Sequence, residues 1–241
     1  MNNIKSCNFI IDSKGNKYCF FYSESAIYCK TRDVNNLIKE TILINRVYNN
    51  FLCSISRDDI IYVLCQARNK DMFLFINEGY GWHMSEIPVI KNTDTLIPMY
   101  LFHLKDSIHI IYCNKLSIAN YYDVYHVIGK KEKWQRNSVC ELYSKKIHSN
   151  ISLLSIKDNY VNMVCTFFDG KQISLNHYVF DTSSEKWYKN QIVNLEDLEV
   201  KIKLLYSNEI IYLICYTIEN QVLTLFKFRK DLNSSFALMD I

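Results

Sequence analysis

Glycine and proline are scarce in this chain, which has five glycines and two prolines among its 241 residues. Turns often rely on glycine for positive φ angles and on proline for a fixed φ. The chain must therefore build its turns from Asn, Asp, Ser and Lys. In contrast, aromatic residues make up 14% of the sequence, and Val, Ile, Thr and Tyr are abundant, which is a composition that favours strands.

An excess of one charge sign is also absent. Lys and Arg number 28 against 25 Asp and Glu, the net charge is +3, and no run of like charges exceeds a few residues. Proteins that bind nucleic acid or membrane surfaces usually concentrate positive charge. We therefore expect a partner that is neither nucleic acid nor a membrane.

Long apolar runs and a signal peptide are missing as well. The first eight residues lack a charged segment followed by an apolar one, and no apolar run is long enough to cross a bilayer. These absences predict a cytoplasmic protein. A secreted location would follow if a signal peptide had been removed from the N-terminus.

Sequence motifs for catalysis and metal binding are absent too. The chain contains no Cys-x-x-Cys or His-x-x-x-His pair, no Gly-x-Ser-x-Gly and no glycine-rich phosphate loop. We expect neither a cofactor nor a metal site, and the lack of catalytic spacing argues against an enzyme. The nine cysteines, an odd number, do not indicate a disulfide framework.

What the sequence does contain is a repeat. A short polar turn followed by an apolar run that ends on cysteine recurs four times, in residues 58–65, 106–113, 158–165 and 208–215. The four cysteines follow one another at intervals of 48, 52 and 50 residues, a period typical of solenoids and propellers. Their regular place at the end of an apolar run predicts small, reduced, buried side chains.

A second landmark has the same period. An aromatic or apolar residue is followed five positions later by a β-branched one, as in Trp82 and Ile87. The other pairs are Trp134 and Val139, Trp187 and Ile192, Phe236 and Ile241, and Leu37 and Ile42. The tryptophan rings could stack on sugars or fill space between sheets, and Leu37, which has no stacking face, favours packing. Residues 17–22 repeat the apolar run with Tyr22 in the place of cysteine, so the chain holds five copies.

Each copy can be divided into four short strands separated by polar turns. In the second copy we expect these strands at residues 51–56, 60–65, 72–77 and 82–87. The second strand is apolar on both faces, as a strand sandwiched between neighbouring sheets must be. The pattern predicts an all-β fold, a five-bladed β-propeller with four antiparallel strands per blade. A β-sandwich is the structural alternative.

We expect residues 1–241 to form a single β-propeller domain. Its blades are predicted at approximately residues 5–44, 45–94, 95–146, 147–198 and 199–241. The first copy starts with a first strand and the last copy ends on a fourth strand. The ring would therefore close without an exchanged strand.

This layout resembles five-bladed β-propellers with repeats of this size, among them the tachylectin type of multivalent sugar-binding lectin. The resemblance covers the whole chain at the level of repeat period and strand pattern. It includes no binding motif, so no site residue is carried over from it. The resemblance implies carbohydrate binding as one function. Some five-bladed propellers are glycosidases with carboxylates around a central cavity, and Asp94, Glu196 and Asp197 would be the candidates here.

The loops favour a different function. A lectin with one site per blade would repeat the same polar and aromatic loop residues, whereas the loops of this chain diverge from copy to copy. We therefore rank first a non-catalytic module that binds one protein or peptide partner, with the multivalent lectin second and a glycosidase-like hydrolase third. Loop position and side-chain type select five candidate binding residues, Arg68, Tyr121, Tyr122, His148 and Asp169.

Replacing these five residues by alanine, one at a time, is expected to weaken partner capture and to leave the melting temperature almost unchanged. The reason is that loop side chains used for binding carry little of the packing. A glycan array and affinity capture, run beside thermal unfolding, measure the two effects. An equal loss of binding and of thermal stability would show that a residue is structural.

Overall fold

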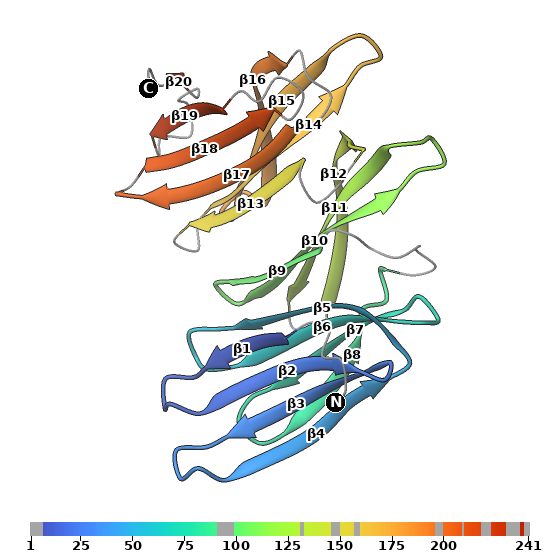
Figure 1. The fold of residues 1–241 in the computed structure, drawn as a ribbon, viewed down its shortest axis with the longest axis vertical. Coiled ribbons are helices and arrows are strands. Elements are labelled where there is room, and N and C mark those ends of the chain that lie inside the picture. The colour runs from blue at the N-terminus through green and yellow to red at the C-terminus, as the bar shows by residue number, and fades with distance from the viewer. Residues whose placement is uncertain are drawn as a thin grey trace. The chain divides into compact units, whose positions relative to one another are not determined.

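The computed structural model of the protein describes residues 7–90, 99–130, 133–145, 150–156, 160–195, 200–208, 210–217, 223–229 and 237–238. These residues form 20 strands in five four-stranded sheets, and no helix is found among them. In every sheet, strands that follow one another in the chain are also neighbours in the sheet (Figure 1). Six residues singled out above lie outside the described ranges, namely Asp94, His148, Glu196, Asp197, Phe236 and Ile241.

The chain forms two compact units. The first comprises Met1–Ile111 and Val127–Arg136, and the second comprises Tyr112–His126 and Asn137–Ile241. Two whole sheets belong to each unit, and the sheet in the middle of the chain contributes residues to both. The single domain expected from the sequence stays a prediction.

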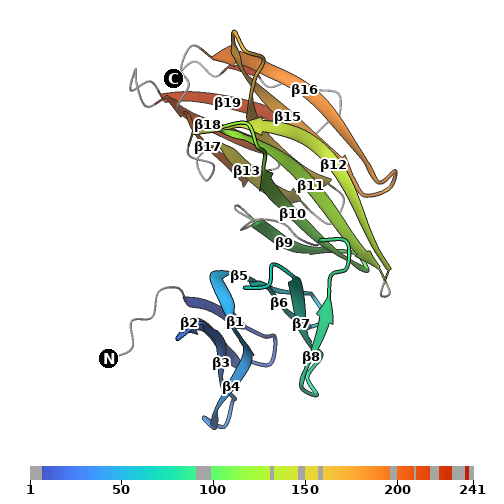
Figure 2. The same cartoon turned by 90° about the vertical axis from the view of Figure 1, so that its right-hand side faces the viewer.

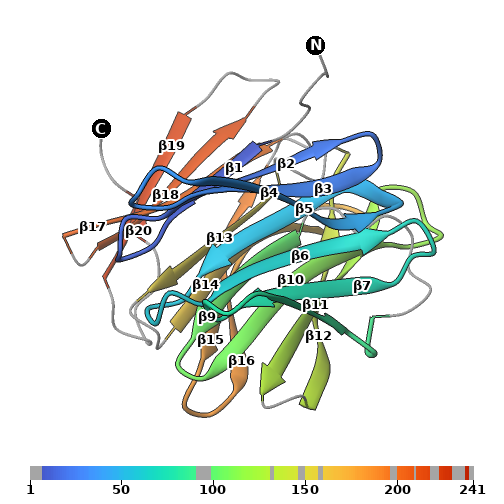
Figure 3. The same ribbon diagram turned by 90° about the horizontal axis from the view of Figure 1, so that it is seen from below.

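The first unit contains the sheets β1–β4 and β5–β8, which are antiparallel throughout (Figure 3). Their strands are β1 (Cys7–Ile11), β2 (Lys17–Ser23), β3 (Ala26–Arg32), β4 (Ile38–Asn45), β5 (Val47–Ile55), β6 (Ile61–Ala67), β7 (Met72–Asn77) and β8 (Trp82–Glu86). The sheet that is divided between the units consists of β9 (Met99–Leu104), β10 (Ser107–Lys115), β11 (Tyr121–Lys130) and β12 (Lys133–Tyr143).

The second unit contains the sheets β13–β16 and β17–β20, which are also antiparallel. Their strands are β13 (Ile151–Ile156), β14 (Tyr160–Phe168), β15 (Ile173–Asp181), β16 (Lys186–Leu195), β17 (Val200–Ser207), β18 (Ile210–Thr217), β19 (Leu223–Arg229) and β20 (Ala237–Leu238). The long hairpin of β15 and β16 is visible in Figure 2. The prediction of an all-β chain with four strands per copy is confirmed.

In the second copy, the observed strands agree closely with three of the four strands predicted from the sequence. The third strand, β7, covers residues 72–77 as expected, and β6 and β8 start within one residue of the expected positions. The first strand begins earlier, because β5 starts at Val47 rather than residue 51. Between residues 47 and 51 the register of β5 against β6 shifts, and such an irregularity has no signature in the apolar pattern.

The register of the first hairpin corrects the prediction that Tyr22 is equivalent to the periodic cysteines. Across the first turn of the second copy, the Ser56 amide donates a hydrogen bond to the Ile60 carbonyl. In the first copy, the Asp12 amide donates the equivalent hydrogen bond to the Asn16 carbonyl. Counting from these turns places Phe21 opposite Cys7, as Cys65 lies opposite Phe51. Phe21, and not Tyr22, therefore occupies the cysteine position, because the two turns have equal lengths but the apolar run of the first copy begins two residues later, after Lys17.

Turns in the described residues are made largely without glycine, as the composition predicts. Ten non-glycine residues have positive φ angles, against four glycines. Seven of the ten are Asn, Asp, Ser or Lys, namely Ser25, Asn36, Asp59, Lys70, Lys105, Asn120 and Asn208. Asp59 also links two turns, because its carboxylate accepts hydrogen bonds from the amide of Ser13, at 2.9 Å, and from the Ser13 hydroxyl. These bonds hold the pKa of the exposed Asp59 carboxyl below its usual value.

The second strands of the middle three sheets are largely buried. All seven residues of β6 are buried, as are most residues of β10 and β14. The four periodic cysteines, Cys65, Cys113, Cys165 and Cys215, are each at most 1% exposed. The structure contains no disulfide among the nine cysteines. The prediction of small, buried side chains at this position is confirmed, and their reduced state stays a prediction.

In the first unit, neighbouring sheets share one apolar core. Phe20 and Ile27 of the first sheet pack with Val63 and Phe75 of the second. The ring of Trp82 meets Phe20 edge to face, with 5.8 Å between the ring centroids. The first strands β1 and β5 also contact each other, as do β5 and β9. Trp82 therefore fills space between sheets, which is the packing role expected from Leu37 at the equivalent position.

The second unit is built in the same way. Val164 and Leu175 of the fourth sheet pack with Leu204 and Leu213 of the fifth. The first strands β13 and β17 contact each other, and the Leu204 amide donates a 3.0 Å hydrogen bond to the buried Ser152 hydroxyl. No segment of the described chain is a helix of the length and hydropathy that crossing a membrane would require.

Gly129 marks a close approach between two strands of one sheet. Its backbone has no positive φ angle, but a Cβ atom at this position would lie 2.6 Å from the Trp134 ring. Real Cβ atoms do not approach another atom so closely, so the absence of a side chain lets the ring lie flat over the strand. Trp134 thus also has a packing role.

The substitution Gly129→Ala is expected to destabilise the protein by about 1–3 kcal/mol, the usual cost of overpacking. Strand propensity alone would favour alanine slightly, so the sign of the effect is diagnostic. Urea unfolding measures it. In a Trp134→Leu background the cost of Gly129→Ala should largely disappear, and an unchanged cost there would contradict the contact with the ring.

His177 lies in the core of the fourth sheet. The residue is 1% exposed, and its Nε2 atom lies 2.9 Å from Oδ1 of the buried Asn162. Because the amide oxygen only accepts, Nε2 carries the proton. Burial lowers the pKa of His177 from 6.5 to about 4, so the folded protein keeps this ring neutral.

Stability is therefore expected to depend on pH. A histidine whose pKa is lowered by folding contributes its full stability above the unfolded pKa and loses it as the pH falls from about 6.5 toward 4. The loss between pH 7 and 4.5 should be on the order of 2–3 kcal/mol in urea unfolding. His177→Gln, which keeps a donor for Asn162 but does not titrate, should lose less over the same interval. Equal pH dependence in the two proteins would contradict the assignment.

Candidate functional site

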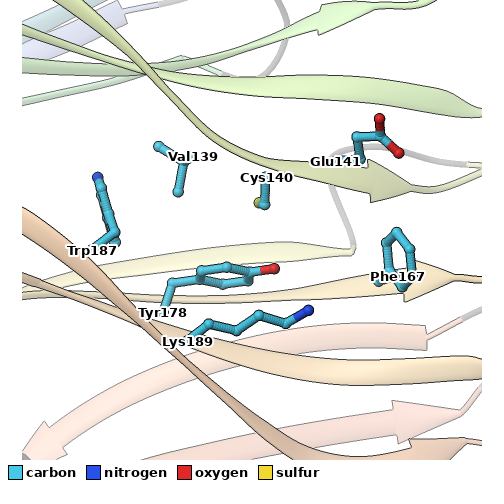
Figure 4. A pocket seen from close by; sticks show the side chains of 7 residues that line it. All are labelled: Val139, Cys140, Glu141, Phe167, Tyr178, Trp187 and Lys189. Carbon is cyan, nitrogen blue, oxygen red and sulfur yellow. The ribbon is translucent and has the colours of Figure 1, made fainter.

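A pocket of about 350 Å³ opens in the second unit. Its walls come from β12, β14, β15 and β16, and its lining residues are Val139, Cys140, Glu141, Phe167, Tyr178, Trp187 and Lys189. Figure 4 shows the three β12 side chains on one side and those of Tyr178, Trp187 and Lys189 on the other. Its volume lies at the lower end of the range for small-molecule sites.

Strand register brings the lining residues of the fourth sheet onto one face. Tyr178 of β15 lies directly opposite Lys189 of β16, and Phe180 lies opposite Trp187. Residues two apart on a strand point to the same side. The alternation therefore places Tyr178, Trp187 and Lys189 together, on the side of the sheet that faces the pocket.

Trp187 is held in place by residues behind the pocket. Its indole Nε1 donates a 3.2 Å hydrogen bond to Nδ1 of the buried His126. The same ring lies 5.5 Å from the His126 ring and 5.3 Å from Phe180, measured between centroids. The hydrogen bond requires an unprotonated Nδ1, so His126 is neutral with its proton on Nε2. This contact fixes the orientation of the tryptophan ring before any ligand arrives.

Lys189 lies over two aromatic rings. Its ammonium nitrogen is 5.5 Å from the centre of the Phe167 ring and 5.9 Å from the centre of the Tyr178 ring. Both distances lie within the range of a cation–π interaction. The rings limit the positions that the flexible side chain can take, so the charge is presented at a defined place in the pocket.

Cys140 forms the wall opposite these rings. Its Sγ atom lies 3.9 Å from Sγ of Cys165. Hydrogen bonding to Cys140 and burial together raise the pKa of the Cys165 thiol well above its ordinary value. Burial, reinforced by the nearby Cys140, likewise raises the pKa of Tyr178. The Tyr178 hydroxyl in the pocket and the Cys165 thiol beside it therefore stay uncharged at neutral pH, and the acidic and basic side chains of the lining are Glu141 and Lys189.

This arrangement can bind a small polar ligand without covalent chemistry. Three aromatic rings offer apolar faces, the Glu141 carboxylate accepts hydrogen bonds, and the Lys189 ammonium donates them. No group of three or more His, Cys, Asp or Glu side chains within the described segments could hold a metal ion.

The candidate residues chosen from the loops lie elsewhere. Arg68 is exposed in the first unit, and its guanidinium donates a 2.7 Å hydrogen bond to the Ser25 hydroxyl. Asp169 is exposed in the turn after β14, where its carboxylate accepts hydrogen bonds from the amides of Lys171 and Gln172. These bonds lower the pKa of the Asp169 carboxyl. Both side chains thus have partners within the protein.

The tyrosine pair is placed on β11. Tyr121 and Tyr122 are half-buried, and the Tyr121 hydroxyl lies 3.4 Å from the carbonyl oxygen of Phe168, next to Asp169. The structure therefore brings Tyr121 close to the turn that contains Asp169. Whether these residues and Arg68 form a binding face stays a prediction.

Several pocket residues were missed from the sequence. Glu141 and Lys189 lie inside the strands β12 and β16, whereas the candidates from the sequence are selected by loop position. Trp187 was noticed as a repeated aromatic and assigned to packing, and its ring both packs on His126 and lines the pocket. In the sequence, Lys189 follows the repeated Trp187 by two positions. This spacing places a charged side chain on the same strand face as the tryptophan and could have indicated the site.

No family model matches the chain, and no curated protein matches it. Solved structures do match. The six-bladed fucose-recognising lectin of Aleuria aurantia aligns at a TM-score of 0.55 and 12% identity, over all of this chain and 81% of that one.

Two further structures extend this likeness. The SapL1 lectin, solved with α-methyl fucoside, aligns at a TM-score of 0.53 and 9% identity, over 96% of this chain and 78% of that one. An ulvan lyase from a family of polysaccharide lyases aligns at a TM-score of 0.61 and 12% identity, over 99% of this chain and 70% of that one. At such low identity the likeness concerns the fold. Together with the repeated four-stranded sheets, it shows that this chain has a β-propeller fold.

Proposed function

We propose that the protein is a carbohydrate-binding β-propeller whose sugar site is the pocket of Tyr178, Trp187, Lys189 and Glu141. The observation that carries this proposal is the combination of aromatic faces with one carboxylate and one ammonium group in a pocket of about 350 Å³. Sugars present apolar C–H faces and a rim of hydroxyl groups. An aromatic ring can stack on the C–H face, while charged side chains form strong hydrogen bonds with the hydroxyl groups.

Similarity to lectins supports this function over the protein-interaction scaffold that the divergent loops favour. Two of the aligned proteins are lectins that recognise fucose or were solved with a fucoside. Nothing in the comparisons supports a protein partner. The divergence of the loops is compatible with a sugar site, because the proposed site is built from strand residues rather than from loops.

The proposal includes a ring of five blades that closes without an exchanged strand. Five four-stranded sheets, with contacts between the first strands of successive sheets within each unit, support it. A further support is the first sheet, where Phe9 is 75% and Ile11 is 63% exposed on one face of β1. An apolar sheet face of this kind is normally covered by a neighbouring layer.

Two conservative substitutions test the sugar site. Lys189→Met keeps the length and apolar contact of the side chain and removes its charge, and Glu141→Gln does the same for the carboxylate. Loss of a hydrogen bond to a charged group should weaken sugar binding roughly tenfold or more. A glycan array with the wild-type protein identifies the sugar, and isothermal titration then compares the variants.

Lys186→Met is the matched control, because Lys186 is exposed on the same strand and lies opposite Asp181, outside the pocket. Its affinity for the sugar should equal that of the wild type. The assignment of this function to the pocket is wrong if the wild type binds no glycan. It is also wrong if Lys189→Met and Glu141→Gln both bind the sugar with the affinity of the wild type.

A further inference from the structure

A second pair of cysteines lies close together in the first unit. The Sγ atoms of Cys7 on β1 and Cys19 on β2 are 3.1 Å apart. For comparison, Cys140 and Cys165 are separated by 3.9 Å. Neither Cys7 nor Cys19 belongs to the four periodic cysteines, so the repeat does not account for this pair.

The strand register explains the proximity. Cys7 lies opposite Phe21, and Cys19 lies opposite Phe9, so the two cysteines are diagonal neighbours on adjacent antiparallel strands. Cys7 lies two residues from Phe9, the residue directly opposite Cys19. Residues two apart on a strand, and residues directly opposite each other, point to the same face, so the two cysteine side chains share one face of the sheet. Strand pairing therefore holds the two sulfur atoms together without help from a loop.

The surroundings of the pair differ from those of the periodic cysteines. Cys7 is exposed and Cys19 is half-buried, whereas Cys65, Cys113, Cys165 and Cys215 are buried. Burial, and then the hydrogen bond with Cys7, raise the pKa of Cys19 to about 12. Cys7 is thus the thiol that a reagent in solution meets first, and Cys19 is the neighbour that can react with it afterwards.

We propose that Cys7 and Cys19 are a redox-active pair that forms a disulfide between β1 and β2 in an oxidising thiol–disulfide buffer. The inference is independent of the sugar site. The co-reactant is a low-molecular-weight disulfide such as oxidised glutathione.

The exchange takes two steps. The Cys7 thiolate attacks one sulfur of oxidised glutathione, forms a mixed disulfide and releases one glutathione thiolate. The Cys19 thiolate then attacks the Cys7 sulfur and releases the second glutathione thiolate. The protein loses two electrons and two protons, and one oxidised glutathione becomes two reduced molecules. The second step is intramolecular, so the high effective concentration of Cys19 offsets its raised pKa.

The bond would attach the first strand of the chain covalently to its sheet. β1 has five residues, pairs with β2 on one side, and exposes Phe9 and Ile11. Linking it to β2 restricts the unfolded chain and prevents separation of the strand at its N-terminal end. Oxidation should therefore raise the urea midpoint of unfolding.

Peptide mapping tests the proposal directly. The full chain is refolded in a mixture of reduced and oxidised glutathione. Remaining thiols are alkylated and the protein is digested with trypsin. We expect one dominant disulfide between the peptide of residues 6–14 and that of residues 18–30. The latter also contains Cys29, so the experiment is run on Cys29→Ser as well, where the link should persist.

Cys7→Ser and Cys19→Ser should each abolish both the linked peptide and the upward shift of the urea midpoint on oxidation. Cys140→Ser is the matched control and should leave both unchanged. Three results would overturn the proposal: full alkylation of Cys7 and Cys19 after refolding, a dominant link between Cys140 and Cys165 instead, or a midpoint that oxidation moves equally in wild type and Cys7→Ser.

Discussion

Burial of one strand on both of its faces is the constraint on which this fold depends. In the second strand of a sheet, alternate side chains point to opposite sides, so a strand such as β6 with every residue buried needs a layer on each side. A four-stranded sheet cannot satisfy this need by itself. Radial stacking of similar sheets does so, with each sheet serving as the cover of the next.

The same requirement explains the small side chains at the end of these strands. Cys65 packs in the core shared by the first two sheets, and Cys215 packs in the core shared by the last two. A thiol is a compact apolar group and needs no strong hydrogen-bond partner. The tryptophans lie on the outermost strands, where Trp82 reaches across to Phe20 of the neighbouring sheet and Trp134 lies over Gly129.

A pocket arises where this packing is incomplete. Trp187 uses one part of its ring to contact His126 and Phe180, as an interior residue does, and another part lines the cavity with Tyr178 and Lys189. Because the rings are fixed by the core, the site is largely formed before a ligand binds. Preorganisation of this kind reduces the entropy lost on binding. In the proposed sugar site, Trp187 would therefore serve both packing and binding.

The amino-acid sequence by itself determined the repeat, the four strands of each copy and the burial of the periodic cysteines, because these follow from local alternation and from a period of about fifty residues. It did not determine the register shift in β5 or the position of Phe21, since both depend on hydrogen bonds across a hairpin. Only the tertiary structure could assemble the pocket, which joins Glu141 to Lys189 and Trp187 across two sheets. No spacing along the chain encodes that contact, because it results from how the face of one sheet meets the next.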